Sequence, residues 1–148
     1  MQVRSYAAPF ATAALVLLSG LVVGCGGDKL GHVSGKVTFG GKPVPAGSIQ
    51  IQPDGSKGNV GPSGYAEIKD GKYDTQISGG KAAKPGPVIF AVEGIDPVPP
   101  PGAAPDVTTT VLFPRYEVSG ELPPATSIKD IEVPLTAAKV TRPSGPGP

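Results

Sequence analysis

The sequence predicts an all-β protein, a small antiparallel β-sandwich of about seven strands that follows an N-terminal signal helix. Two observations favour this class. Short runs of alternating apolar and polar residues recur from His32 onwards, and Gly and Pro, which number 22 and 19 in 148 residues, separate many of them. In addition, no stretch after residue 25 shows the 3.6-residue apolar period of an amphipathic helix.

The N-terminal segment, residues 1–25, differs in composition from the rest of the chain. Arg4 supplies a positive charge, Ala7 to Val23 is almost entirely apolar, and the first acidic residue is Asp28. This order of features is typical of a secretory signal peptide. A membrane anchor helix is the alternative, but an apolar stretch of about 17 residues is at the short limit for a span, and Pro9 weakens it further.

The end of this segment, Leu21-Val22-Val23-Gly24-Cys25, resembles the lipobox of bacterial lipoproteins. That family places a small residue directly before an invariant Cys, and it more often has Leu where this chain has Val22. The resemblance implies that Cys25 carries a diacylglycerol, that cleavage falls between Gly24 and Cys25, and that the new amino group is acylated. A thiolate is the nucleophile that such chemistry needs, and Cys25 is the only Cys of the chain.

Several acyl chains would hold the mature protein at a membrane, because each buried methylene contributes about 0.8 kcal/mol and one chain alone binds only marginally. We therefore expect the membrane to be a partner through the lipid anchor. The protein would be exported, on the periplasmic side or the cell surface, at the cell membrane or the outer membrane. Residues 1–24 would be the signal peptide and residues 25–31 a short lipid-anchored tether.

The folded domain is expected over residues 32–135. Residues 32–39 alternate, with Val33, Val37 and Phe39 on one face, and Gly40 to Pro43 form a turn. Residues 48–52 alternate again, with Ile49 and Ile51 inward, and a polar loop follows over residues 54–62.

The strongest local signal is a hairpin formed by residues 65–69 and 72–77 around Asp70-Gly71. An Asp-Gly pair between alternating runs predicts a type I′ turn, because both residues tolerate positive φ. The residues expected on the core face are Ala66, Ile68, Tyr73 and Ile77.

The second half of the domain is less regular. Residues 88–92 are apolar at nearly every position, which predicts a strand that is buried on both sides or central in the sandwich. The Pro-rich residues 96–106 should be irregular, and residues 111–118 an irregular strand interrupted by Pro114. In the last strand, residues 130–135, the inward residues are Ile131, Val133 and Leu135, and Pro134 indicates an edge strand. Residues 136–148 are expected to be a disordered Pro/Gly-rich tail.

The run from Val33 to Val92 resembles the carboxypeptidase regulatory-like, transthyretin-like β-sandwich domains. The matching features are a first strand with Gly-x-Val, a Gly-x-Pro turn, a second strand, an Asp-Gly-x-Tyr hairpin and a final apolar strand. Phe113-Pro114-Arg115-Tyr116, followed by residues 131–135, resembles a group of small envelope lipoproteins with this domain. The resemblance implies the fold, but it supplies no catalytic residue.

The composition argues against several functions. A net charge of +1 gives no reason to expect nucleic acid as a partner. One His and one Cys exclude a multi-cysteine zinc site and a histidine metal cluster, and we expect no metal or other cofactor. His32 is the only imidazole available as a base, and its place on the polar face of the first strand suggests a solvated surface residue.

Four other features of the sequence have some of the properties of a binding site. Glu67, Asp70 and Asp74 bring carboxylates together as a calcium site would, but their spacing is that of a hairpin. Tyr65, on the face opposite the core, could stack on a sugar ring; partial burial under a loop is the simpler interpretation. Residues 78–81 lack the full pattern of a phosphate loop. Residues 97–101 favour polyproline II, as a docking segment or, more simply, a stiff surface loop.

These observations predict a non-enzymatic, lipid-anchored cell-envelope protein whose β-sandwich has a structural or protein-binding role, with an envelope protein or a glycan as partner. The alternative is a carbohydrate- or peptide-binding accessory module, and an enzyme is the third hypothesis. An exposed row of aromatic residues would favour the alternative, and a pocket with convergent acid and base groups would favour an enzyme.

Overall fold

The protein is described by a computed structural model that covers residue 2 and residues 29–139. Within these residues the chain is all-β, as predicted, and the only helical segments are two 3-10 turns. None of the described helices has the length and apolar character needed to cross a membrane. The elements are β1 (His32–Phe39), β2 (Lys42–Pro43), β3 (Ala46–Pro53), η1 (Gly55–Lys57), β4 (Gly64–Lys69), β5 (Lys72–Asp74), β6 (Gly86–Asp96), β7 (Thr110–Leu122), β8 (Thr126–Ile128), β9 (Ile131–Val133) and η2 (Leu135–Lys139).

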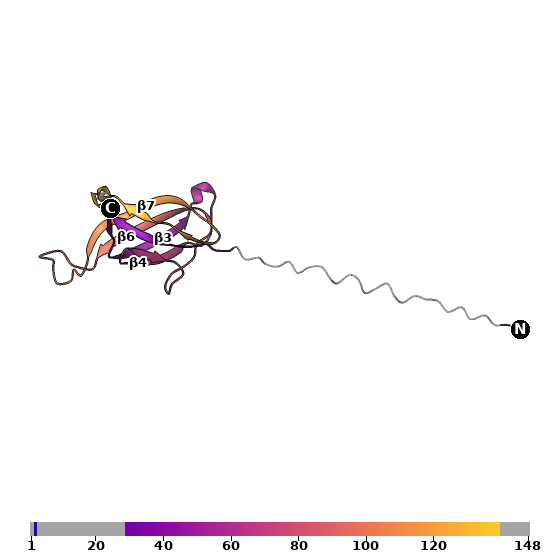
Figure 1. Cartoon of the computed structure of the whole chain (residues 1–148), viewed down its shortest axis with the longest axis horizontal. Coiled ribbons are helices and arrows are strands. Elements are labelled where there is room, and N and C mark those ends of the chain that lie inside the picture. Colours follow the sequence, from indigo (N-terminus) through magenta and orange to yellow (C-terminus); the bar gives the residue numbers. More distant parts are fainter. Residues whose placement is uncertain (1, 3–28, 140–148) are drawn as a thin grey trace, which may run out of the picture.

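The strands form one curled sheet in the order β2-β1-β5-β4-β3-β6-β7. All neighbours along this path pair in antiparallel fashion. Figure 1 shows β4, β3, β6 and β7 following one another across the molecule. The predicted antiparallel pairing does not extend to the last two strands, because β8 and β9 both pair with β1 in parallel.

β8 and β9 behave as one strand that is interrupted once. Val33 faces Ser127 and Val37 faces Ile131, so both pairings have the same register. At the interruption, the carboxylate Oδ1 of Asp130 accepts a hydrogen bond from the backbone N–H of Lys36 at 2.8 Å. The side chain thus provides an acceptor where the ladder of backbone hydrogen bonds is broken.

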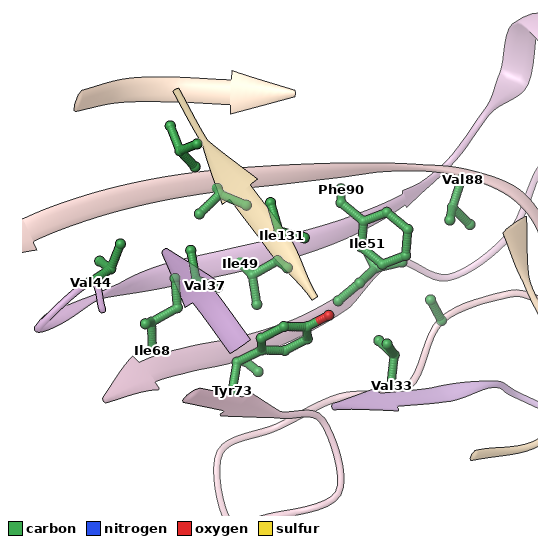
Figure 2. Packing of buried hydrophobic residues seen from close by; sticks show 14 of the residues in the cluster. Val33, Val37, Val44, Ile49, Ile51, Ile68, Tyr73, Val88, Phe90 and Ile131 are labelled. Carbon is green, nitrogen blue, oxygen red and sulfur yellow. The ribbon is translucent and has the colours of Figure 1, made fainter. Parts of the chain in front are cut away.

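The core lies inside the curl of the sheet (Figure 2) and is built from the alternating residues of each strand. The expected inward residues of the first two strands are confirmed, since Val33, Val37, Ile49 and Ile51 are at most 1% exposed. Phe39 is half-buried and packs against this core, with its ring centroid 5.0 Å from that of Phe113. Further core residues are Val44, Ala66, Ile68, Tyr73, Ala83, Val88, Phe90, Val92, Leu122, Ile131 and Val133.

The predicted Asp70-Gly71 turn is confirmed. Asp70 has a φ of 50° and Gly71 a φ of 72°, and Lys69 pairs with Lys72 across the turn. The second strand is shorter than predicted, because β5 ends at Asp74 and the chain turns. Ile77 therefore lies outside the core with 54% of its surface exposed, and its predicted inward position is wrong.

The apolar strand β6 is central, as predicted, between β3 and β7. The predicted interruption at Pro114 is wrong, because β7 continues through it. Val92 pairs with Tyr116, and Gly94 pairs with Phe113. Between these two pairs β7 has two residues, Pro114 and Arg115, opposite the single residue Glu93 of β6, which is a β-bulge. β7 ends the sheet path, so one side of its backbone needs no partner, and a residue without an N–H is tolerated there.

The C-terminal strand also ends earlier than predicted. β9 stops at Val133, directly before Pro134, and Leu135 begins η2 with 64% of its surface exposed rather than pointing inward. Ala137 is buried at 7% exposure and belongs to the core. The start of the expected tail at residue 136 thus falls within η2, and residues 140–148 lie outside the described part of the chain.

Candidate functional site

An open groove of about 570 Å³, hereafter the outer groove, lies on the outer face of β1, β4, β5 and β8. Its position follows from strand alternation: where Val37, Ile68 and Tyr73 point to the core, their neighbours point outward. The groove is lined by Ser34, Gly35, Lys36, Glu67, Lys69, Lys72, Tyr73, Asp74, Ile77, Ile128 and Asp130.

The carboxylates of the outer groove each have a local partner. Glu67 forms an ion pair with Lys69 at 2.7 Å, and the hydrogen bond between them raises the pKa of Lys69. Asp74 accepts a hydrogen bond from the backbone N–H of Gln76 at 2.8 Å, and Asp130 accepts the one from Lys36. The acidic groups therefore hold turns and strand ends in place, and they do not converge on a common point.

Tyr73 joins the groove to the core. Its ring lies among the aliphatic side chains of the cluster (Figure 2). Its hydroxyl donates a hydrogen bond to the backbone carbonyl of Lys129 at 2.7 Å. Burial raises the pKa of Tyr73 well above its ordinary value, and the nearby charge of Asp130 raises it further. The hydroxyl thus stays protonated and acts as a fixed donor that ties β5 to the segment between β8 and β9.

Two exposed aliphatic side chains add an apolar component to the groove. Ile77 is 54% exposed and Ile128 is 81% exposed. Exposed apolar groups next to ammonium and carboxylate groups are suited to contacts with an extended peptide, which presents the same kinds of group. Proton transfer would need an acid and a base facing one reacting atom, and the carboxylates of this groove do not have that arrangement.

A second, smaller groove of about 390 Å³ lies at the end of β1, where Phe39, Leu112 and Leu135 approach one another. It also includes Gly40, Lys42, Pro43, Pro45 and Asp96. This groove shows that η2 lies beside the first residues of β7.

His32 is half-buried rather than fully solvated. Its Nδ1 lies 3.2 Å from the hydroxyl of Thr75, and the same hydroxyl accepts a hydrogen bond from the backbone N–H of Val33 at 2.9 Å. Because this N–H occupies an acceptor position, the Thr75 hydroxyl can donate its own proton to His32 Nδ1. The contact gives His32 a structural role at the start of β1.

The carboxylates weighed as a calcium site are not brought together. Asp70 occupies the hairpin turn, Asp74 bonds Gln76, and Glu67 pairs with Lys69. Over residues 29–139, no group of three or more His, Cys, Asp or Glu side chains is placed to hold a metal ion.

The structure also shows the surroundings of Tyr65 and of the two loops that the sequence singled out. Tyr65 is half-buried, and its backbone is bridged to that of Lys81, which agrees with partial burial under a loop. Residues 78 and 79 form a turn, the chain then reaches the bridge at Lys81 with no helix after it, and residues 97–101 form an exposed irregular loop. The remaining sites, Gly24 and Cys25, lie outside the described residues.

Sequence reasoning missed the outer groove. The outward positions of Lys36 and Lys72 could be read from strand alternation. Their proximity could not, because it depends on the pairing of β1 with β5. Ile128 lies in a short strand that had no sequence signal and was not predicted.

Comparisons with known proteins give little support for any assignment. No family model matches the chain, and no curated protein matches it. Among solved structures, the chain is similar to a 9R-lipoxygenase from Cyanothece PCC8801, with a TM-score of 0.37 and 14% identity. The match covers 90% of this chain and 20% of the lipoxygenase chain, so this chain spans about a fifth of its length. A similarity of this size carries no argument about fold or function.

Proposed function

We propose that this protein is a non-enzymatic, lipid-anchored protein of the bacterial cell envelope whose β domain binds another protein. The observation that carries the proposal is Leu21-Val22-Val23-Gly24-Cys25, in which the only Cys of the chain ends an apolar segment. A diacylglycerol on Cys25 and a further acyl chain would anchor the domain durably, because the affinity of acyl chains for a membrane increases with each buried methylene. The anchor would lie in the cell membrane or the outer membrane, on the exported side.

For the domain, we propose a sandwich of the carboxypeptidase regulatory-like, transthyretin-like class. The order of elements supports this assignment. A first strand with Gly35 and Val37 is followed by a glycine turn, a strand, the Asp70-Gly71 hairpin and the apolar strand β6. These features are turns and core residues, so they support a fold class and leave the chemistry open.

The outer groove supports protein binding over the alternative of carbohydrate binding. Sugar recognition on a sheet commonly uses exposed aromatic rings. Here Tyr65 is half-buried and Tyr73 belongs to the core. The groove instead offers ammonium, carboxylate and aliphatic groups, which match the side chains and backbone of a peptide.

The lipid anchor is tested by the variant Cys25→Ser in the full chain, expressed in a bacterium and labelled with radioactive palmitate. The wild-type protein should incorporate label and have the mass of a cleaved, acylated chain. The variant should incorporate none, because a hydroxyl cannot replace the thiolate as acceptor. Ser19→Ala, a change in the same segment, is the matched control and should remain labelled. An unchanged mass and label in Cys25→Ser would show that the anchor is wrongly assigned.

A further inference from the structure

β7 presents a free strand edge. It ends the sheet path and, among the described residues, pairs only with β6. η2 lies beside its first residues, near Leu112. From Tyr116 to Leu122 no described strand pairs with its outer edge, and Figure 1 shows β7 beyond β6 at the side of the molecule. An exposed edge of this kind is a template for another strand.

Charged side chains restrict which strand can join this edge. Arg115, Glu117 and Glu121 are all exposed on β7. Arg115 donates a hydrogen bond from Nε to Glu117 at 2.7 Å, and its Nη1 lies 3.5 Å from Gln50 on β3. In this conformation the side chain crosses β6 on the outer face of the sheet, and it would turn towards the free edge to meet a partner. Charges on an edge strand are a common means of preventing unspecific pairing. They also admit a partner whose charges are complementary.

Two of the three charges on this edge, together with the side-chain sizes, are complementary to themselves about Val118, whereas Glu117, which pairs with Arg115 in its own chain, would face Ser119. In an antiparallel pair centred on this residue, Arg115 would face Glu121 of a second copy, and the same contact would occur a second time by symmetry. Tyr116 would face Gly120, so the large ring would lie opposite a residue without a side chain and no steric clash would arise. The apolar Val118 would face its own copy, where opposite residues on paired strands are in contact.

We propose that β7 binds β7 of a second copy of this chain, antiparallel and with Val118 on the two-fold axis. Backbone hydrogen bonds between the two edges would supply the attraction, and the Arg115–Glu121 pairs would set the register. This inference goes beyond the proposed function by naming a partner, and it does not require the lipid anchor.

The register is tested by Val118→Cys in the full chain, oxidised in membranes of expressing cells and examined on a non-reducing gel. Directly opposite residues have Cβ atoms about 4.5–5.5 Å apart, close to the spacing of a disulfide. Val118→Cys should therefore give a disulfide-linked dimer. Val111→Cys is the control. Val111 is exposed on β7, whereas Val118 is partly buried against the core, and Val111 would lie far from its own copy. Equal dimer yields from the two variants, or no dimer from Val118→Cys, would overturn the proposal.

The charge pairs are tested in the same assay by adding Arg115→Glu or Glu121→Arg to Val118→Cys. Each single change turns two attractive contacts into repulsive ones, so we expect the dimerisation constant to fall at least roughly tenfold. The double charge swap should restore the dimer, and so should co-expression of the two single variants. If the double swap stays monomeric while its thermal unfolding is unchanged, the register is wrong. The chain without an added Cys carries only Cys25, so a dimer band from it would count against lipidation and not against β7 pairing.

Discussion

At the scale of single residues, the side chain of Tyr73 has two roles. The ring contributes to the core, and the hydroxyl reaches the carbonyl of Lys129, which is 56 residues further along the chain. This hydrogen bond fixes the segment at which β8 stops and β9 begins. It therefore connects the Asp70-Gly71 hairpin to the C-terminal part of the fold.

We expect Tyr73→Phe to keep the fold and to lower the free energy of unfolding by about 0.5–1.5 kcal/mol, the usual contribution of a hydrogen bond. Urea denaturation of both proteins measures this difference. Tyr65→Phe is a matched control on the outer face and should change the stability less. An equal loss in the two variants would mean that the bond to Lys129 has no particular importance.

The same hydroxyl predicts a dependence on alkaline pH. Because burial raises the pKa of Tyr73 above its ordinary value of 10.0, the folded state favours the protonated hydroxyl. The resulting stabilisation is complete below pH 10 and is lost as the pH rises above that value, where the unfolded chain ionises first. Wild-type protein should therefore lose stability above pH 10 more steeply than Tyr73→Phe in the same titration.

At the scale of elements, two glycine turns show the same backbone conformation in different surroundings. Gly41 has a φ of 78° between β1 and β2, and Gly71 has a φ of 72° between β4 and β5. A Cβ at Gly41 would meet nothing within 4 Å, whereas a Cβ at Gly71 would lie 2.6 Å from the Cβ of Pro43. The second turn is thus packed against Pro43 of β2, whereas the first turn is open to solvent at Gly41.

We expect Gly41→Ala to cost about 1–2 kcal/mol, the strain of an L-residue in the left-handed region. Gly71→Ala should cost about 1–3 kcal/mol more, since overpacking against Pro43 adds to the strain. Chemical denaturation of the two variants checks the order. Similar losses of stability in the two variants would indicate that β2 moves away from an added Cβ at little cost. The contact between Gly71 and Pro43 would then not stabilise the hairpin.

At the scale of the whole molecule, the C-terminal residues close the core. β9 places Ile131 and Val133 beside β1, and η2 adds Ala137 to the same cluster. The backbone N–H of Ala137 donates a hydrogen bond to the carbonyl of Pro134 at 2.9 Å. The folded domain therefore includes residues that the composition of the chain assigns to a tail.

Truncation tests this boundary. A chain that ends at Lys139 should be as stable as the full chain if the core is complete by η2. A chain that ends at Leu135 should lose about 1 kcal/mol or more, because Ala137 no longer covers the core. Thermal unfolding of both truncated chains measures the difference, and equal midpoints would place the end of the domain before residue 136.

Much of the fold was predictable because its signals are local. Alternation identified the inward residues of β1 and β3, and Asp70-Gly71 identified a turn that requires positive φ. Local patterns failed where a strand's length depends on its neighbours. Ile77 and Leu135 continue an alternating pattern, but they lie outside the core because the chain turns after Asp74 and after Val133. Pro114 looked like an interruption, but the outer side of an edge strand needs no N–H.

The sequence by itself determined the all-β class, the positions of most strands, and the motif at Cys25 on which the proposed anchor rests. Only the tertiary structure decided that β1 lies between β5 and the parallel strands β8 and β9, which creates the outer groove, and that no strand among residues 29–139 pairs with the outer edge of β7. The physical reason is that alternation and turn residues act over a few neighbouring positions. Which strands meet depends on contacts between distant residues, made when the whole chain buries its apolar faces together.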